Sequence, residues 1–245
     1  MQLIFGIQSS GAWSPIYQKI ADWQQWPNKL IEGQDNQALV PKLPQVPAMQ
    51  RRRYSKLTKM LLEVAFQCHA PANCRTIFAS RHGELNRTVD LLQDIVREQP
   101  ISPIGFSQSV HNTASGIFSI LTNNRSPSTS IAAGETTLAQ ALIEAYGQLS
   151  EDNSDLLLVF GDEPVADIYK EFTDEPELPI ALALQLTLPK HGQELKLTLS
   201  LETQPTAAQL ATVEPICYGQ LLHAIASQQN LCGQLNQFVW HITHG

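Results

Sequence analysis

Residues 125–138, with the sequence RSPSTSIAAGETTL, restrict the fold more than any other stretch of this chain. Their apolar and small side chains predict a buried strand that leads directly into a helix, with Glu135 at the turn between them. Such a turn presents one side chain at a helix N-terminus, where unpaired N–H groups and the helix dipole favour negative charge. Cysteine there would become a reactive thiolate, whereas glutamate is a much poorer acyl acceptor. The stretch therefore predicts an α/β elbow that is built like a nucleophile site but lacks the nucleophile.

The helix that follows this elbow is expected to be central. Its apolar side chains recur at helical spacing, and they are Leu138, Ala141, Leu142, Ala145 and Leu149. We therefore expect the helix start, with Glu135, to lie in a cleft. An isolated buried carboxylate costs roughly several kcal/mol, so Glu135 would be protonated, paired with a cation or stabilised by the helix N-terminus. The simpler alternative is that Glu135 is an ordinary first-turn residue.

The rest of the chain has the pattern of one α/β unit. A short apolar strand is predicted at residues 2–8, and a long helix with one inward face at residues 46–66. Residues 156–160 are a continuous apolar run, which is typical of a central parallel strand. Residues 181–188 and 195–201 alternate apolar with polar on either side of PKHGQ, which predicts a hairpin. The remaining predicted elements are strands at 75–80 and 238–243 and helices at 85–98 and 205–230.

Charge and composition exclude several classes of function. The 245-residue chain carries a net charge of −7, which argues against nucleic acid as a partner. Residues 1–11 lack a signal-peptide pattern, and no apolar run approaches the roughly 20 residues of a membrane span, so we expect a cytoplasmic protein without membrane insertion. The four cysteines form no CxxC pair and are expected to be reduced thiols. His241 and His244 would point to opposite faces of a strand, so we expect no metal, and we also expect no cofactor.

Two charged runs interrupt this composition. The only dense basic cluster consists of Arg51, Arg52, Arg53, Lys56 and Lys59. In an acidic chain it is either a contact for an acidic partner or a solvated helix face. The acidic residues between positions 162 and 177 are most simply explained as a solvated loop.

Residues 109–145, SVHNTASGIFSILTNNRSPSTSIAAGETTLAQALIEA, resemble the nucleophile region of β-ketoacyl synthases. When the two are aligned through the Pro-Ser strand, the active-site cysteine of the family falls on Glu135, and a shift of one residue would place it on Gly134. Four other segments also resemble elements of this family. Residues 46–66 resemble its first long helix, residues 76–88 its first core strand and the following turn, and residues 155–164 and 179–186 two later strands. The resemblance implies a thiolase-like α/β fold, a mixed sheet covered by helices. Residues 1–190 would be the family's N-terminal half, and residues 191–245 a divergent extension packed on the same domain.

The resemblance also has gaps. Condensing synthases carry two histidines in HGT-like and GHN-like motifs of their second half, whereas no His-Gly pair here is followed by threonine. The chain is most similar to chain-length factors, the inactive synthase homologues that pair with active ones, and among them to the short form of aryl polyene type II polyketide systems. This implies a non-catalytic subunit that forms a heterodimer with a catalytic β-ketoacyl synthase and helps to shape its acyl tunnel. Through that complex the chain would also meet an acyl carrier protein and its phosphopantetheine-bound acyl chain.

The same resemblance assigns roles to particular residues. The family segment that matches SPIGFS reaches across the dimer, which implies that Ile104, Gly105 and Phe106 gate the tunnel. The further interface residues implied by the resemblance are His111, Asn112, Ser128, Ser130 and Ile131. If the basic cluster meets the acidic carrier protein, the contact residues are Arg51, Arg52, Arg53 and Lys56.

Two other interpretations stay open. One is a small acyl-carrier-protein decarboxylase or thioesterase in which Glu135 and His111 act as acid and base. The other is a homodimeric scaffold that binds a carrier protein. In the resemblance, however, His111 lies at a helix start near the subunit interface, which favours a structural histidine.

Overall fold

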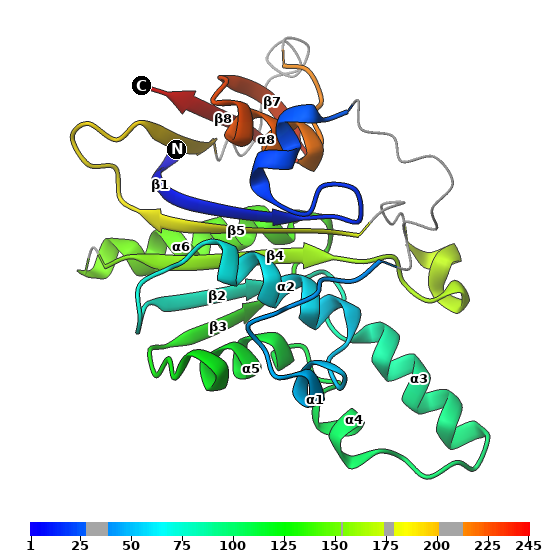
Figure 1. Ribbon diagram of the computed structural model, residues 1–245. Coiled ribbons are helices and arrows are strands. Elements are labelled where there is room, and N and C mark those ends of the chain that lie inside the picture. The colour runs from blue at the N-terminus through cyan, green and yellow to red at the C-terminus, as the bar shows by residue number, and fades with distance from the viewer. Residues whose placement is uncertain (28–38, 153, 174–178, 201–212) are drawn as a thin grey trace.

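The computed structural model describes residues 1–27, 39–152, 154–173, 179–200 and 213–245, which form one mixed eight-stranded sheet covered by helices (Figure 1). The strands are β1 (Gln2–Trp13), β2 (Arg75–Ala79), β3 (Ser128–Ile131), β4 (Leu156–Asp162), β5 (Ile180–Thr187), β6 (Leu195–Ser200), β7 (Leu231–Leu235) and β8 (Phe238–His244). The α-helices are α1 (Ala48–Arg51), α2 (Lys56–Gln67), α3 (Leu85–Val96), α4 (Pro103–Ser107), α5 (Thr113–Thr122), α6 (Thr137–Asp152) and α8 (Tyr218–Ser227). Short 3₁₀ helices are η1 (Ile20–Gln25), η3 (Gly134–Thr136) and η4 (Asp167–Phe172). The sheet order is β3-β2-β4-β5-β1-β6-β8-β7, so the predicted mixed sheet covered by helices is confirmed.

Three neighbouring strands at one side of the sheet run parallel. β2 pairs in parallel with both β3 and β4, so that Phe78 lies between Ser130 and Val159. Every residue of β4 is buried, as its continuous apolar run predicts. The carboxyl ends of β3, β2 and β4 therefore meet at one edge of the sheet, and the elbow with Glu135 lies at that edge.

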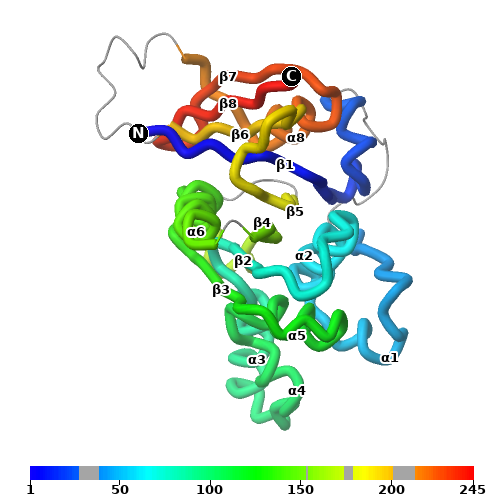
Figure 2. Tube along the Cα trace, turned by 90° about the vertical axis from the view of Figure 1, so that its left-hand side faces the viewer, coloured from blue at the N-terminus to red at the C-terminus, as the bar shows by residue number. Residues whose placement is uncertain are grey.

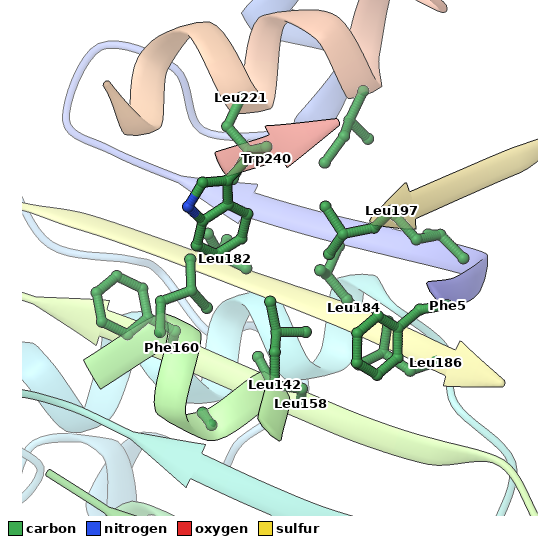
Figure 3. Packing of buried hydrophobic residues seen from close by; sticks show 14 of the residues in the cluster. Phe5, Leu142, Leu158, Phe160, Leu182, Leu184, Leu186, Leu197, Leu221 and Trp240 are labelled. Carbon is green, nitrogen blue, oxygen red and sulfur yellow. The ribbon is translucent and has the colours of Figure 1, made fainter. Parts of the chain in front are cut away.

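Two apolar clusters cover the two faces of the sheet. Successive side chains of β4 alternate between these clusters. Leu158 packs with α6 and α8, whereas Leu157 packs with α2 and α5. Figure 2 shows α6 on one side of the parallel strands and α2 and α5 on the other. Side chains from distant strands, among them Leu182 and Trp240, gather in the first cluster (Figure 3). The helix after the elbow is therefore central, as predicted.

β5 and β6 do not form the hairpin that their alternating pattern predicts. β1 lies between them and pairs antiparallel with both, so that Gly6 faces Thr187 on one side and Lys196 on the other. A hairpin pattern does not reveal whether a third strand enters between its two arms, and this explains the wrong prediction. β1 also continues beyond the predicted end at Gln8, with a bulge after Ile7. In the region 191–245, β6, β7 and β8 continue the same sheet.

The long helix predicted at residues 46–66 is two helices. α1 and α2 are separated by a turn that ends at Ser55, whose Oγ accepts a hydrogen bond from the backbone N–H of Thr58 at 2.9 Å. Serine is a strong helix-start signal, and this cap outweighs the helical spacing that continues through the turn. α2 buries its inward face as predicted. Arg52 and Arg53 lie at the turn rather than on the face of a long helix.

The C-terminal part of the chain holds one described helix. α8 accounts for part of the helix predicted at 205–230, and residues 205–212 lie outside the described residues. Across the described ranges, no helix combines the length and apolar character needed to cross a bilayer.

α3 and α4 form an arm, residues 85–107, that projects from the body of the molecule (Figure 1). Within α3 only Val89 is buried, although the helix is amphipathic. The exposed apolar side chains of the arm are Leu92, Ile95, Val96, Ile101, Ile104 and Phe106. A projecting helix pair with so much exposed apolar surface is typical of a contact surface for another molecule.

Candidate functional site

Two threonines fix the elbow between β3 and α6. Thr137 Oγ1 accepts a hydrogen bond from the Ala133 N–H at 2.9 Å and donates one to the Gly134 carbonyl oxygen at 2.6 Å. Thr136 Oγ1 donates to the Ala133 carbonyl oxygen at 2.9 Å. Gly134 adopts a φ of +56°, a left-handed conformation that glycine takes without a side-chain clash. The elbow is therefore a tight turn whose hydroxyl groups satisfy backbone atoms that the short 3₁₀ turn leaves open.

The side chain of Glu135 is exposed, so the prediction of a buried carboxylate in a cleft is wrong for this chain. α6 buries Thr137, Leu138 and Ala139, but the 3₁₀ turn before it directs Glu135 outward. The backbone carbonyl of Glu135 does have a partner, because it accepts a hydrogen bond from the Asn236 side-chain amide. An exposed carboxylate keeps its hydration, so the desolvation cost expected for a buried Glu135 does not arise.

A polar cluster lies where β2 and β4 end, beside the elbow. Asp162, which is 3% exposed, accepts hydrogen bonds through Oδ1 from Ser80 Oγ at 3.0 Å and from the Arg81 N–H at 2.8 Å. Ser80 Oγ also accepts a hydrogen bond from the Gly83 N–H at 3.0 Å. The acidic run that begins at Asp162 was predicted to be a solvated loop. For Asp162 this prediction is wrong, because its carboxylate is buried and hydrogen-bonded. Asp162 fixes the turn after β2 against the end of β4.

Two C-terminal side chains complete this edge, and the sequence pattern did not single out either of them. Tyr218, in the first turn of α8, packs against Phe160, with the ring centroids 5.2 Å apart and the rings tilted by 44°. Burial, reinforced by the negative charge of Asp162, raises the pKa of Tyr218 to about 12, so its hydroxyl stays neutral. Asn236, in the β7–β8 turn, is hydrogen-bonded to Tyr218 and donates to the Glu135 carbonyl. The C-terminal segments therefore lie against the elbow.

His111, which precedes α5, packs against the turn after β2. Its Nε2 donates a hydrogen bond to the Ser80 carbonyl oxygen at 2.9 Å, and a Cβ added to Gly83 would come within 2.7 Å of its Cδ2. In the described part of the chain, no hydrogen bond or ion pair joins His111 to Glu135. Asn112 is exposed, and its carbonyl oxygen accepts a hydrogen bond from Ser115 Oγ at 2.9 Å. His111 is therefore positioned to hold a turn.

β3 forms one edge of the described sheet and pairs only with β2 there. Ser128 is exposed and accepts a hydrogen bond from Thr76 Oγ1 at 2.8 Å, while Ser130 and Ile131 are half-buried. The Ser115 and Ser130 hydroxyl oxygens are 3.5 Å apart, which links β3 to α5. The interface residues predicted on this strand thus lie at an edge that is open to another chain.

The residues predicted to gate a tunnel lie on α4, the second helix of the arm. Ile104 is 41% exposed and Phe106 is 67% exposed. Gly105 is half-buried, and its N–H donates to the Ser102 Oγ, the N-cap of α4, at 3.1 Å. The two apolar side chains are therefore presented to the outside on a capped turn.

The basic cluster is divided by the break between α1 and α2. Arg51 Nη1 donates to the carbonyl oxygens of Lys42 at 2.8 Å and Leu43 at 3.1 Å, which holds the guanidinium against its own chain. Arg52 and Arg53 are exposed. Among the described residues no group of three or more His, Cys, Asp or Glu side chains is arranged to hold a metal ion.

Similar solved structures share this fold. The chain resembles a chain of the ketosynthase ApeO in complex with its chain length factor ApeC from Xenorhabdus doucetiae, at 25% identity and a TM-score of 0.77, covering 99% of this chain and 100% of that chain. The ishigamide ketosynthase/chain length factor matches at 13% identity and a TM-score of 0.69, with 99% of each chain covered. A third match is to AntDE:AntF, a type II PKS acyl-carrier protein in complex with its ketosynthase bound to the hexaketide. Its sequence identity is 11% and its TM-score 0.56, and the match covers 77% of this chain and 63% of that chain. At 13% and 11% identity, the second and third matches show a shared fold and nothing more. The predicted thiolase-like ketosynthase fold is confirmed.

The sequence matches agree with the structural ones. No curated protein sequence gave a match. The family described as Beta-ketoacyl synthase, N-terminal domain, matches residues 23–241, which is most of the chain. The chain therefore belongs to the β-ketoacyl synthase N-terminal domain family.

Proposed function

We propose that this chain is a non-catalytic, chain-length-factor-like subunit that forms a heterodimer with a catalytic β-ketoacyl-ACP synthase and shapes its acyl tunnel. The observation that carries the proposal is the uncovered apolar surface of the arm, whose six exposed apolar side chains are between 41% and 83% exposed. Several exposed apolar side chains on one projecting helix pair are expected to be covered by a protein partner. The likeness to the complex of ApeO with its chain length factor ApeC supports a synthase as that partner.

The open edge of β3 supports the same partner. An unpaired edge strand exposes a row of N–H and C=O groups that pair readily with a second strand. In the resembled family, this strand pairs antiparallel with its counterpart across the dimer axis. Ser128, Ser130 and Ile131 would then lie at the centre of the heterodimer, with His111 and Asn112 beside them.

The elbow supports a non-catalytic role. Acyl transfer to the Glu135 carboxylate would give an anhydride, which water hydrolyses quickly, so Glu135 is a poor replacement for a cysteine nucleophile. The catalytic cysteine would instead come from the partner. Ile104, Gly105 and Phe106 on the arm would reach that subunit's pocket and limit the length of a polyene or polyketide chain bound to an acyl carrier protein. We place this complex in the cytoplasm, where its free thiols would stay reduced.

The rival enzyme has less support. A decarboxylase or thioesterase would need Glu135 and His111 to act on one substrate, but His111 Nε2 is already bonded to the Ser80 carbonyl oxygen. A homodimeric scaffold would cover the arm with a second copy of the chain, which the experiment below distinguishes by mass.

The test is to express the chain alone and together with a β-ketoacyl-ACP synthase from the same organism. Native mass should show a 1:1 heterodimer on co-expression, and condensation activity should require the synthase cysteine. Alone, the chain should be poorly soluble or self-associated, because the arm and the β3 edge remain uncovered. A stable, well-behaved monomer, or hydrolase or decarboxylase activity of the chain alone, would contradict the proposal. A homodimer that persists when the synthase is present would favour the scaffold.

A further inference from the structure

A pocket of about 430 Å³ lies at the root of the arm, where α2, α3 and α4 approach one another. Its charged lining residues are Arg52, Arg53, Lys56, Arg87, Asp90 and Glu163. Gly105 of α4 lies at its rim, so the pocket adjoins the gate residues. Four cations therefore meet two carboxylates in one concave site, within a chain whose net charge is −7.

The cations of the pocket are only partly neutralised. Arg87 pairs with buried Glu84, with Nε and Oε2 3.3 Å apart. Burial raises the pKa of the Glu163 carboxyl, and the nearby Lys56 ammonium opposes this shift. Among the described residues no carboxylate forms an ion pair with Arg52 or Arg53. The pocket thus keeps two guanidinium groups that are available to an anion.

Hydrogen bonds to neighbouring groups hold Ser55 and Arg87, two residues of the pocket lining, in place. Glu84, 4% exposed, accepts hydrogen bonds through Oε1 from Ser55 Oγ at 2.7 Å and Thr58 Oγ1 at 2.6 Å. Arg87 Nη2 donates to the Arg53 carbonyl oxygen at 2.8 Å, which fixes the α1–α2 turn to α3. These bonds use two of the five N–H donors of Arg87 and hold its guanidinium in place. A positioned arginine loses little conformational freedom when it binds.

We infer that this pocket binds a phosphoryl group. The Arg87 side chain is only 17% exposed, so a flat acidic protein surface would reach it poorly, whereas a compact anion enters a concave site. Guanidinium groups match phosphoryl oxygens through paired, charge-assisted hydrogen bonds. Free phosphate compounds and the phosphodiester of a carrier protein's prosthetic arm share this chemistry. Only the assignment to a carrier protein's prosthetic arm rests on the proposed function. Binding of a phosphoryl group at this pocket does not depend on it.

The test is a titration of the full-length chain with inorganic phosphate, against chloride at matched ionic strength. We expect saturable 1:1 binding, weakened about tenfold or more in the double variant Arg52→Ser/Arg53→Ser. Both side chains are exposed, so the variant should keep the wild-type circular dichroism spectrum. The matched control is Arg97→Ser/Lys190→Ser, which removes two exposed positive charges away from the pocket and should bind phosphate like the wild type.

A second titration of the heterodimer separates the two sources. Tighter binding of a carrier protein that bears its phosphorylated arm than of one without it, lost in the Arg52/Arg53 double variant, would assign the pocket to the arm. Equal binding of both carriers, with phosphate binding retained, would assign it to a free phosphate compound. Absent phosphate binding, or equal binding by the double variant and the wild type, would overturn the inference. Either failure would leave heterodimer formation intact, so the proposed function is judged separately.

Discussion

At the scale of single residues, Glu135 has an exposed side chain but a backbone that belongs to the elbow. If the partner supplies the nucleophile, Glu135→Gln should leave condensation by the heterodimer unchanged. Glu135→Ala should lower the free energy of unfolding by only about 0.3–1 kcal/mol, because it removes a negative charge from a helix N-terminus. Steady-state assays of the purified complex and chemical denaturation would measure the two effects. Glu144→Gln, an exposed carboxylate on α6, is the matched control. A loss of turnover by orders of magnitude in Glu135→Gln alone, with the complex assembled, would instead support acid–base catalysis by this chain.

Glu163 should make stability depend on pH. Burial raises its pKa above the ordinary value of 4.5, so the folded chain holds this proton more tightly than the unfolded chain does. The sign follows from linkage: stability falls as pH rises from the unfolded value through the folded one, because a partly buried carboxyl must ionise. Glu163→Gln removes this cost. Its stability relative to the wild type should therefore increase as the pH rises above the ordinary value of 4.5, as measured by urea denaturation.

The control for that experiment is Glu171→Gln, which changes an exposed carboxyl in η4 and should show the same pH dependence as the wild type. A pH-independent difference between Glu163→Gln and the wild type would contradict the assignment.

Residue-level burial was the hardest property to infer from the sequence. The position of Glu135 at a strand-to-helix turn follows from the apolar pattern, but its exposure depends on a single 3₁₀ turn. Asp162 is buried because β2 and β4, far apart in sequence, end side by side and supply its donors. Local charge patterns carry no information about such long-range pairing.

At the scale of elements, the arm combines an exposed apolar face with the capped turn α4. If α4 reaches the synthase pocket, Phe106→Ala should lengthen or broaden the product distribution, and Gly105→Phe should shorten it. A Cβ at Gly105 would lie 3.3 Å from Ser102 Cβ and 3.5 Å from Leu91 Cδ2, so the backbone needs only a small adjustment. One methylene of apolar contact contributes about 0.8 kcal/mol, so several blocked carbons should outweigh a modest assembly defect. Mass spectrometry of carrier-bound intermediates would measure the lengths.

Phe172→Ala is the matched control for the gate, because Phe172 is 72% exposed and Phe106 is 67% exposed. This control, on η4, should leave the product lengths unchanged. The same lengths in Phe106→Ala, Gly105→Phe and the wild type would rule out a gate on α4.

Most elements follow from sequence periodicity, but their boundaries and neighbours follow less well. Periodicity predicts the buried run of β4 and the inward face of α2. It does not predict the break before Ser55, where the N-cap of α2 starts a new helix. This boundary matters for function, since it places Arg52 and Arg53 beside α3 and at the pocket.

At the scale of the whole molecule, the order of strands could not be obtained from the sequence alone. β1 comes first in the chain yet lies fifth in the sheet, between β5 and β6, and its last three residues, Gly11, Ala12 and Trp13, are all buried. The continuous apolar run of β4 predicted a central parallel strand, and the family resemblance implied a mixed sheet. The antiparallel half depends on pairings between residues nearly two hundred positions apart, such as Gln2 with Ser200, for which turn signals give no guidance.

The arm also gives the sharpest test of assembly. Burying an isoleucine or phenylalanine side chain contributes about 1.5–3 kcal/mol, so replacing two of them with aspartate at a true interface should weaken association by at least about 100-fold. We therefore expect Ile104→Asp/Phe106→Asp to abolish the heterodimer at micromolar concentration. Ile168→Asp/Phe172→Asp replaces two side chains of η4 that are at least as exposed, and it should assemble normally. Co-purification with a tagged synthase, followed by sedimentation, would measure both. Equally strong assembly of the two double variants would show that Ile104 and Phe106 do not lie in the interface.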